Sequence, residues 1–509
     1  MFLLRIRVHY KQIFTHKPQH TPAGVYYRGH HRLPLLQRVN PTIVEDFEKR
    51  YQRRENEEIY YQKSESISKT QKHRSPAFVL DGCTPNDVAT AMIESGRQKE
   101  PFYLFHLDEA YRRIQHFKRR MPRVQIFYAM KANDDDMFLK LCLSFGLGFD
   151  CASPGEINKV RHLNNSPRRI IYATPSKTRE QITFARDSGV RHTTFDSSYE
   201  LMKIKQFWPD ARLLLRIRVD GESMYKLGKK FGCDFETEAI GLLEEAASLG
   251  LSVVGVAFHV GSACSCTDSY VLGLRRSKAL FEYEDKAGRG MHIVDIGGGF
   301  MSDTTDRIDE VADFVNEALD EYFPDPTVQV VAEPGRYLCD SSYTMYCSIN
   351  NVRKVVKNGK RTNMLYLNDG IYGTLRFPEP WHTVQRFKKS SDRVTDVLED
   401  TILWGPSCDS TDRVMPNIPL QLPRCTPDDW LVFSLQGAYT FGFSTRFSCL
   451  GVPLIRPVVS SHLWSRLRQS EAFSPEDFIA NPDISSPLPS TLPPILSANV
   501  FGRSPALSI

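Results

Sequence analysis

The residues with the greatest chemical potential in this chain lie where short apolar runs end. Lys131 follows one such run in FYAMKAN, Asp150 ends another in GLGFDCA, and His259 and Glu333 lie in AFHVGSAC and VAEPGRY. An amine, two carboxyl groups and an imidazole cover the needs of covalent and acid–base catalysis. Each residue alone is more typical of a rim lysine, a structural histidine or an ion pair. Their joint placement makes a catalytic site worth testing.

A second group of residues is suited to holding a phosphate. Gly297, Gly298 and Gly299 follow the apolar run HIVDI, and glycines can present backbone N–H groups without obstruction by a Cβ atom. Arg336 offers a bidentate phosphate donor, and Ser262 offers a hydroxyl. Together these residues suit a phosphate monoester.

The two groups together match one cofactor. Glu333 supplies a carboxylate that could keep a ring nitrogen protonated, and His259 a flat surface against which a ring could lie. Lys131 supplies an amine for an imine bond. Phosphate, ring nitrogen, planar face and imine lysine are the four features by which proteins hold pyridoxal 5'-phosphate (PLP). The sequence therefore favours a PLP site.

The elements that must position these residues form a repeated pattern. Eight apolar runs alternate with amphipathic segments between about residues 120 and 340: 124–130, 146–152, 169–174, 192–196, 212–219, 253–260, 292–296 and 328–333. Continuous apolar runs are typical of parallel strands buried on both faces. Eight such β-then-α units predict a TIM (β/α)8 barrel, whose active site lies at the carboxyl ends of the strands. A doubly wound open sheet is the alternative.

The pattern changes after Arg336, where short runs are broken by Pro, Gly, Asn and Asp, which predicts a mostly antiparallel β domain. We expect residues 1–75 to form an extension or charged linker and 76–108 to contribute to the β domain. The barrel is expected over 109–341, the β domain over 342–465 and a Pro/Ser-rich tail over 466–509.

Composition excludes several classes of protein. Hydrophobic residues make up 41% and charged residues 25%, and the formal net charge is only +5, which does not suggest a nucleic-acid-binding protein. The eleven cysteines show no paired CxxC motifs, so we expect neither a zinc site nor a disulfide framework. No apolar run could span a bilayer. We expect a cytoplasmic protein, with mitochondrial import an alternative because no acidic residue precedes Glu45.

The order of these motifs resembles the eukaryotic ornithine decarboxylase family, which pairs a TIM barrel with a β domain. The resemblance runs from about residue 76 to about 465. It depends on FYAMKAN, FDCASPGEI, IYATPSK, FHVGSAC, DIGGGF, EPGRY, NDGIYG, WGPSCDSTD and GAYT. It implies decarboxylation of a basic amino acid, with ornithine to putrescine in polyamine synthesis as the main expectation.

The resemblance implies a role for each matching residue. Lys131 is similar to the Schiff-base lysine, His259 to the residue stacked on the pyridine ring and Glu333 to the partner of its nitrogen. The cofactor site is further implied to include Asp150, Ser262, Gly299, Pro334, Gly335, Arg336 and Tyr439. Cys408 resembles the proton-donating thiol and Asp409 a substrate-amine contact. In the family both reach the other subunit's site, which implies a homodimer, and Phe447 matches an aromatic residue near that interface.

One segment departs from the family pattern. The family carries an aspartate for the substrate's distal amine shortly after NDGVYG, but this chain has NDGIYGTLRFPEPWHTV. An ungapped count from Tyr372 places Trp381 at that position, and counting from WGPSCD places Pro380 there. Glu379 is the nearest carboxylate, and Asp409 is a second candidate. Three outcomes therefore stay open: ornithine as the substrate, another amino acid such as lysine or arginine, or a divergent paralogue with poor activity. A smaller departure is Ser410, where the family usually has glycine.

Other functions remain open. The altered segment also fits a non-catalytic regulator resembling the antizyme inhibitors, although the presence of Lys131, Glu333, Arg336, Cys408 and Asp409 favours the enzyme. Residues 174–196 align with the family's antizyme-binding region, so antizyme is a candidate partner, while a solvated barrel helix is the simpler interpretation. An amino-acid racemase or diaminopimelate decarboxylase is less compatible, because racemase relatives place an arginine at the ring nitrogen.

Overall fold

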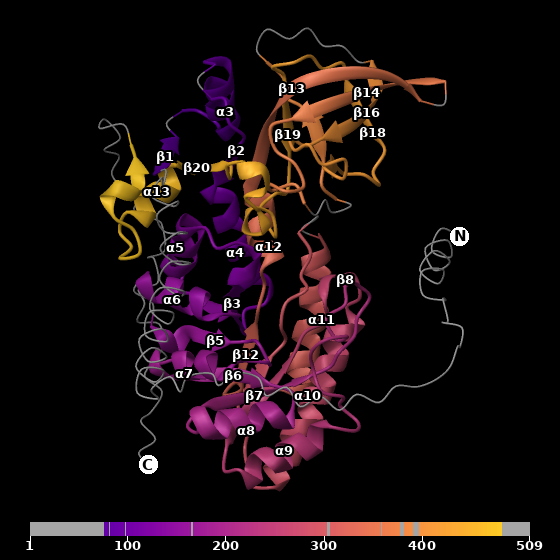
Figure 1. The fold of residues 1–509 in the computed structure, drawn as a ribbon. Helices are drawn as coiled ribbons and strands as arrows, with labels where there is room; N and C mark the ends of the chain where they lie inside the picture. Colours follow the sequence, from indigo (N-terminus) through magenta and orange to yellow (C-terminus); the bar gives the residue numbers. More distant parts are fainter. Residues whose placement is uncertain are drawn as a thin grey trace, which may run out of the picture. The chain divides into compact units, whose positions relative to one another are not determined.

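The structure is a computed structural model that describes residues 76–80, 82–96, 98–163, 166–302, 306–357, 359–376, 381–389 and 397–480. The predicted extension over 1–75 and the last part of the predicted tail lie outside these residues. Most strands of the described part belong to two assemblies: a closed barrel and an 11-stranded mixed sheet (Figure 1).

The barrel consists of eight parallel strands, one in each of the eight predicted runs. They are β3 (Val124–Ala129), β4 (Gly148–Cys151), β5 (Ile170–Tyr172), β6 (His192–Phe195), β7 (Arg212–Ile217), β9 (Ser252–Phe258), β11 (Ile293–Asp295) and β12 (Gln329–Ala332). The pairing of β12 with β3 closes the ring. The predicted TIM barrel is therefore confirmed, and the open sheet is wrong.

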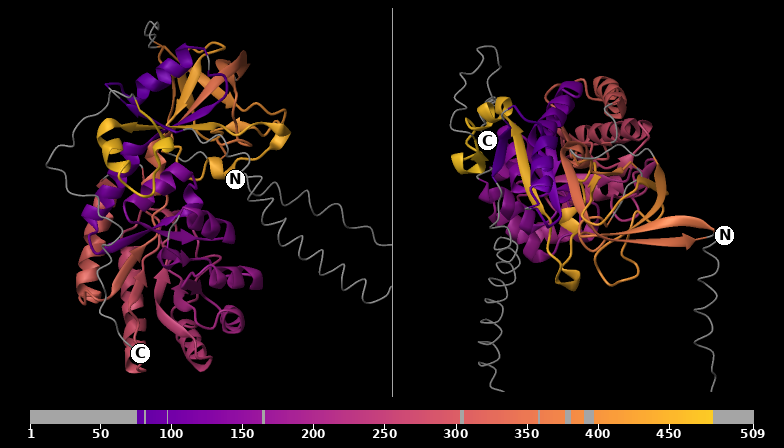
Figure 2. Two further views of the ribbon diagram at one scale, coloured as in Figure 1. Left: turned by 90° about the vertical axis from the view of Figure 1, so that its left-hand side faces the viewer. Right: turned by 90° about the horizontal axis from the view of Figure 1, so that it is seen from above.

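Helices surround the barrel strands (Figures 1 and 2). They are α4 (Leu107–Arg120), α5 (Asp136–Ser144), α6 (Pro154–His162), α7 (Arg179–Asp187), α8 (Ser198–Phe207), α9 (Ala239–Ser248), α10 (Asp268–Lys286), α11 (Asp306–Tyr322) and the short α12 (Arg336–Cys339). Helix α7 begins at a capping box, in which Thr178 and Gln181 each bond the other's backbone N–H. Ser153 caps α6, whose first residue is Pro154.

Side chains alternate between the inside and the outside of each barrel strand. A small buried cluster fills the middle of the barrel and consists of Phe127, Ile171, Ala173, Leu214, Val254, Ala257, Ile293 and Val331. Two residues further along three of these strands, the same inward face carries Arg216, Asp295 and Glu333. The carboxyl end of the barrel therefore has a charged inner layer above an apolar one.

The second assembly combines segments from both ends of the described chain. Its strands are β1 (Ala77–Leu80), β2 (Phe102–His106), β13 (Tyr343–Lys357), β14 (Lys360–Leu367), β15 (Val384–Arg386), β16 (Leu398–Trp404), β17 (Arg413–Val414), β18 (Leu420–Pro423), β19 (Trp430–Phe433), β20 (Leu454–Ser460) and β21 (Phe478–Ile479). Most pairs are antiparallel, while β20 runs parallel to both β1 and β2. The predicted β domain is thus confirmed.

Smaller elements complete the fold. Helix α3 (Pro85–Glu94) precedes β2, and α13 (Ser461–Leu467) follows β20. A two-stranded antiparallel ribbon pairs β8 (Ser223–Tyr225) with β10 (Ser262–Cys264). β8 follows β7 and β10 follows β9 in the chain, but neither strand belongs to the barrel. Among the described residues, no helix is long and apolar enough to cross a membrane.

Candidate active site

Lys131 lies in a 3-10 turn, η1 (Met130–Ala132), immediately after β3. Its Nζ atom donates a hydrogen bond to Oδ2 of Asp150, because β3 and β4 are neighbours and Ala129 is in register with Asp150. The Asp150 side chain is 1% exposed, whereas 39% of the Lys131 side chain is accessible. The amine can therefore be reached by a small molecule while its carboxylate partner is shielded from water.

The charges around Lys131 favour its protonated form. Removal from bulk water opposes the charge, but the carboxyl groups of Asp150 and Glu333 outweigh this effect and raise the pKa of Lys131. To become a nucleophile, the amine must give up its proton, and Asp150, its hydrogen-bond partner, lies close enough to accept it. The barrel thus places an amine and its proton acceptor at one mouth.

Glu333 and Asp295 form a buried pair of carboxyl groups: Asp295 ends β11, and Glu333 directly follows the neighbouring strand β12. Burial raises the pKa of Glu333 well above its usual range, and Asp150 and Asp295 raise it further. Burial likewise raises the pKa of Asp295 to about 7, against the effect of the hydrogen bond that Gly297 N donates to it. The pair therefore retains a proton near neutral pH and would ionise beside a bound cation.

His259 follows β9 directly, and its Nδ1 atom accepts a hydrogen bond of 3.0 Å from the backbone N–H of Gly261. Burial lowers the pKa of His259 well below 6.5, and the charges of Arg216 and Lys131 lower it further. The imidazole is therefore neutral, as suits a ring that stacks on a planar ligand.

The three glycines after β11 leave space that side chains would fill. A Cβ atom on Gly298 would lie 2.6 Å from the carbonyl oxygen of Glu333 and 3.0 Å from Nε2 of His259. Gly297 and Gly299 adopt positive φ values of 66° and 111°, which favour glycine. The segment therefore keeps backbone against backbone at the barrel mouth, as an anion-binding cradle requires.

Arg336 begins α12 and is buried, with 5% of its surface exposed. Its guanidinium carbon lies 5.1 Å from the ring centroid of Tyr439. The backbone N–H of Tyr439 donates to the carbonyl of Ala132, at 2.8 Å, and so ties GAYT to the turn that carries Lys131. The charges of Lys131 and Arg336 both act on the Tyr439 hydroxyl, whose pKa burial nevertheless raises. The Arg336 guanidinium and the Tyr439 hydroxyl therefore lie near the turn that carries Lys131.

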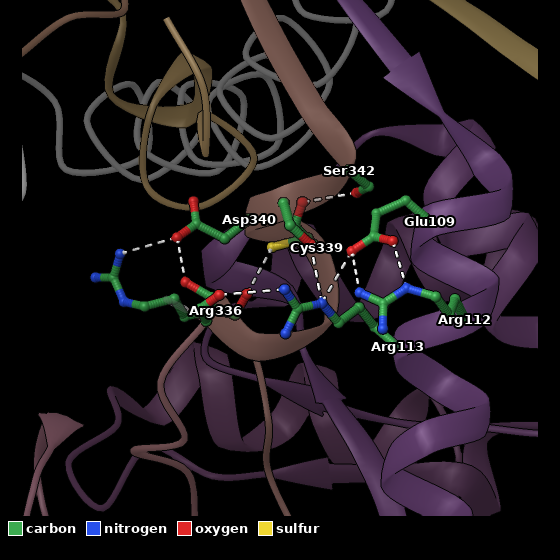
Figure 3. Close-up of polar contacts among 9 residues, drawn as sticks. Glu109, Arg112, Arg113, Arg336, Cys339, Asp340 and Ser342 are labelled. Atoms are coloured by element: carbon green, nitrogen blue, oxygen red, sulfur yellow. Dashed lines mark hydrogen bonds and ion pairs between the residues drawn. The ribbon is translucent and has the colours of Figure 1, made fainter. Parts of the chain in front are cut away.

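Residues around α12 support the position of Arg336 (Figure 3). Ser341 Oγ donates to Glu109 on α4, at 2.6 Å, and Arg113 donates 3.0 Å hydrogen bonds to both of them. Burial would raise the pKa of Glu109, but hydrogen bonds from Arg112, Ser341 and Arg113 lower it to about 2. This ionised network fixes the turn after Arg336 to a barrel helix.

The other predicted cofactor contacts lie around the same mouth. Ser262 begins β10, the Gly299 carbonyl accepts from Cys264 N at 3.0 Å, and the Pro334 carbonyl accepts from Ala129 N at 3.3 Å. A Cβ atom on Gly335 would lie 2.8 Å from that of Ala132, so close packing requires glycine there. Their contacts with a ligand remain predictions.

Cys408 and Asp409 lie in the other assembly, in the loop between β16 and β17. Cys408 is an exposed free thiol. Asp409 accepts hydrogen bonds from the Tyr372 hydroxyl and from Thr411 N, and the Tyr372 ring lies 4.3 Å from that of Phe447. These contacts join Asp409 to Phe447 through Tyr372, and none of them involves a residue of the barrel site.

The altered segment is described only in part. Glu379 and Pro380 lie outside the described residues, but Trp381 lies with its ring centroid 5.4 Å from the guanidinium carbon of Arg336. His382 is buried, and burial and the Arg336 charge lower its pKa to about 3. The described part of the segment thus brings aromatic rings to Arg336.

Sequence reasoning missed Arg216 and Asp295. Both act on the charges of the site, since Arg216 lowers the pKa of His259 and Asp295 raises that of Glu333. The available signal was a charged residue inside an apolar barrel strand, in RLLLRIRV and in HIVDI.

The described residues fit PLP. The glycine cradle and Arg336 suit its phosphate, the buried Glu333 suits its protonated ring nitrogen, and the accessible Lys131 amine suits its aldehyde. One further observation agrees: the Oδ1 atom of Asp150 and the Oδ2 atom of Asp295 are buried without a hydrogen-bond partner among the described residues. A cationic ligand ring would offset these carboxyl groups.

Comparison with known proteins agrees with this fit. Residues 107–340 match the family described as pyridoxal-dependent decarboxylase, pyridoxal binding domain, and residues 336–437 match its C-terminal sheet domain. The chain is 35% identical to rat ornithine decarboxylase, over 80% of this chain and 92% of that protein. It is 36% identical to Xenopus laevis antizyme inhibitor 2, over 73% and 84%. The arginine decarboxylase of Paramecium bursaria Chlorella virus, solved with agmatine, superposes with a TM-score of 0.68 at 33% identity, covering 73% of this chain and all of that one.

Proposed function

Since this chain belongs to the pyridoxal-dependent decarboxylases and is a PLP-dependent amino-acid decarboxylase, we propose that its substrate is a basic amino acid, with ornithine converted to putrescine for polyamine synthesis. The observation that carries this proposal is the group formed by Lys131, Asp150 and Glu333 at one barrel mouth. The relatives named for ornithine and arginine support a substrate with a cationic side chain.

The residues of the barrel mouth divide the work of the reaction. When bound, PLP supplies an electron-accepting ring for the electrons left as CO2 departs. Lys131 would bind the cofactor's aldehyde carbon, whose oxygen would leave as water, and Asp150 would take up the proton that the amine must lose. Glu333 would hold a proton at the ring nitrogen, His259 would cover the ring, and Arg336 with the glycine cradle would hold the phosphate.

A proton must then reach the substrate's α-carbon, and we assign this step to the thiol of Cys408. Asp409 contacts Tyr372, whose ring lies against Phe447, and Cys408 is an exposed thiol next to Asp409 in the chain. We therefore propose a symmetric homodimer in which each subunit supplies Cys408 and Asp409 to the other's site. Asp409 would receive the distal ammonium of the substrate, and Glu379 stays a second candidate for that contact.

A substrate panel tests the proposed activity. Ornithine, lysine, arginine and diaminopimelate would each be assayed for CO2 release, with Lys131→Ala as the inactive control. We expect ornithine to give the highest kcat/KM. A preference for lysine or arginine would correct the substrate and leave the chemistry standing.

Borohydride trapping with peptide mass mapping tests the cofactor linkage separately, by placing the label on Lys131. If the label is on Lys131 but no substrate releases CO2, the chain would be a non-catalytic protein of the antizyme-inhibitor kind. If the label is elsewhere, the proposed site is wrong.

Mixing two inactive chains tests the shared site. Lys131→Ala and Cys408→Ala would each be inactive alone, but a mixed dimer contains one site with both residues intact. Random exchange of subunits should therefore restore roughly a quarter of the native activity. No recovery, with exchange of labelled subunits shown separately, would mean that Cys408 does not act across an interface.

A further inference from the structure

The guanidinium of Arg336 has aromatic rings as neighbours on two segments. Its carbon lies 5.4 Å from the ring centroid of Trp381 and 5.1 Å from that of Tyr439. Both distances are within the range of cation–π attraction, which is stronger for groups removed from water. Arg336 is 5% exposed, so Trp381 helps to fix the direction in which this buried cation presents its N–H groups.

The indole nitrogen of Trp381 is a donor without an acceptor. Its Nε1 atom is buried and has no hydrogen-bond partner among the residues that the structure describes. A buried N–H group normally finds a partner, because leaving it unpaired costs stability. The indole N–H of Trp381 is therefore an unpaired donor close to the cation that is proposed to hold the cofactor's phosphate.

The neighbouring residue does not compete for that anion. His382 is neutral, because burial and the Arg336 charge lower its pKa to about 3. It also lines a small cavity with Leu375, Met415 and Phe433, among others, so its environment is largely apolar. His382 therefore carries no charge that would attract a phosphate, whereas the buried Nε1 atom of Trp381 has no hydrogen-bond partner among the described residues.

We propose that Trp381 is a phosphate-site residue, which fixes the Arg336 guanidinium through its ring and donates its indole N–H to the phosphate that Arg336 binds. In this chain, the segment that carries a substrate-binding carboxylate in the family would then serve the cofactor. This inference rests on the proposed role of Arg336. It also implies that recognition of the substrate's distal ammonium depends on residues other than Trp381.

Comparing PLP with pyridoxal, which lacks the phosphate, tests the proposal without an activity assay. The cofactor-free native chain, Trp381→Phe and Trp381→His would be titrated with each ligand by absorbance. Trp381→Phe keeps a ring over Arg336 but loses the N–H, whereas Trp381→His keeps a ring N–H. Trp464→Phe is the matched control, since Arg468 lies 5.0 Å from the Trp464 ring, far along the chain on α13.

We expect Trp381→Phe to raise the Kd for PLP roughly tenfold or more, the range for a lost hydrogen bond to a charged group. The Kd for pyridoxal should stay unchanged, Trp381→His should recover part of the loss, and Trp464→Phe should bind both ligands as the native chain does. Should Trp381→Phe fail to fold, the ratio of the two Kd values in Trp381→His decides: near-native discrimination supports the proposal, and its loss contradicts it.

An unchanged ratio of the PLP and pyridoxal Kd values in Trp381→Phe would overturn the inference, whether or not the KM for the amino acid changes. A raised KM together with the unchanged ratio would place the indole at the substrate's carboxylate. In both cases the labelling of Lys131 and CO2 release can still succeed, so failure here is distinguishable from failure of the proposed function.

Discussion

Substituting Gly298 by alanine is the sharpest test of the phosphate cradle. The added Cβ atom would lie 2.6 Å from the carbonyl oxygen of Glu333, about 0.8 Å short of the 3.4 Å at which ordinary contact begins. Nε2 of His259, at 3.0 Å, closes the other side. Because the nearest atom belongs to the backbone of β12's end, the cradle itself must move to accept the methyl group.

The size of the effect follows from the cost of overpacking. Forcing one extra carbon into a filled site costs about 1–3 kcal/mol. If the cradle gives way only when the phosphate binds, this energy appears as a loss of affinity of roughly 5- to 150-fold. If it gives way in the free chain, the free energy of unfolding falls by the same amount. The sum of the two losses is therefore the predicted quantity.

Two assays separate these contributions. Titration of the cofactor-free chain with PLP measures the affinity, and urea unfolding measures the stability. Gly241→Ala is the control, because Gly241 lies inside α9 with nothing within 4 Å of its Cβ position. That change should stabilise the chain by about 0.5–1 kcal/mol without affecting PLP binding. If Gly298→Ala leaves both the affinity and the stability at native values, the glycines do not form a tight cradle and the argument for a phosphate site there is refuted.

Three further predictions concern residues at and around the barrel. Lys177→Met breaks a buried ion pair with Glu200 and should lower the free energy of unfolding by about 3 kcal/mol, which is the low end for such a loss because Glu200 keeps its 2.6 Å contact with Lys203. Urea unfolding should show that adding Glu200→Gln to Lys177→Met recovers stability. An equal loss in the single and double variants would contradict a charge-pair effect. Asp295→Asn should weaken the pH dependence of stability in the cofactor-free chain. Burial raises the folded pKa of Asp295 from 3.8 to about 7, so the folded chain holds an extra proton and its stability falls as pH rises between these values. If the variant and the native chain show the same difference in unfolding free energy between pH 5 and pH 8, this prediction is refuted. Thr178→Ala removes the capping box of α7 and should lower the free energy of unfolding by about 1 kcal/mol, measured with urea. Thr90→Ala is the control, because the Thr90 hydroxyl only bonds the Asn86 carbonyl within α3. Equal losses in the two variants would argue against the cap.

The barrel and its mouth could be predicted because parallel strands leave strong local signals. Each buried strand appears as an apolar run, and the chemically active residues follow the run, as Lys131 and His259 do. Asp295 and Arg216 were missed for the same reason, since a single charged residue inside such a run does not reveal which face of the strand it occupies. Only the packing of Ile293 and Leu214 in the buried cluster shows which residues of each strand point into the barrel. Asp295 and Arg216, two positions further along, then lie on the inward face.

Long-range contacts could not be predicted from local patterns. Trp381 lies over Arg336, but no helical or strand period in the sequence links these two segments. The segment of Trp381 could also be aligned with the family in two ways, which place either Trp381 or Pro380 at the position of the family's aspartate. The parallel pairing of β20 with β1 and β2 is a second example, because strand propensity does not specify a partner.

The pairing of β20 between β1 and β2 also bears on how this chain is made. Strands β1 and β2 leave the ribosome first, yet their neighbour β20 emerges only after the entire barrel has been translated. Until then the edges of β1 and β2 that face β20 have no native partner and are open to association with other chains. A nonsense codon shortly before Leu454 would also remove β21, and so would leave an intact barrel sequence with β1 open on both edges and β2 open on one. Such a product should need chaperones to avoid aggregation.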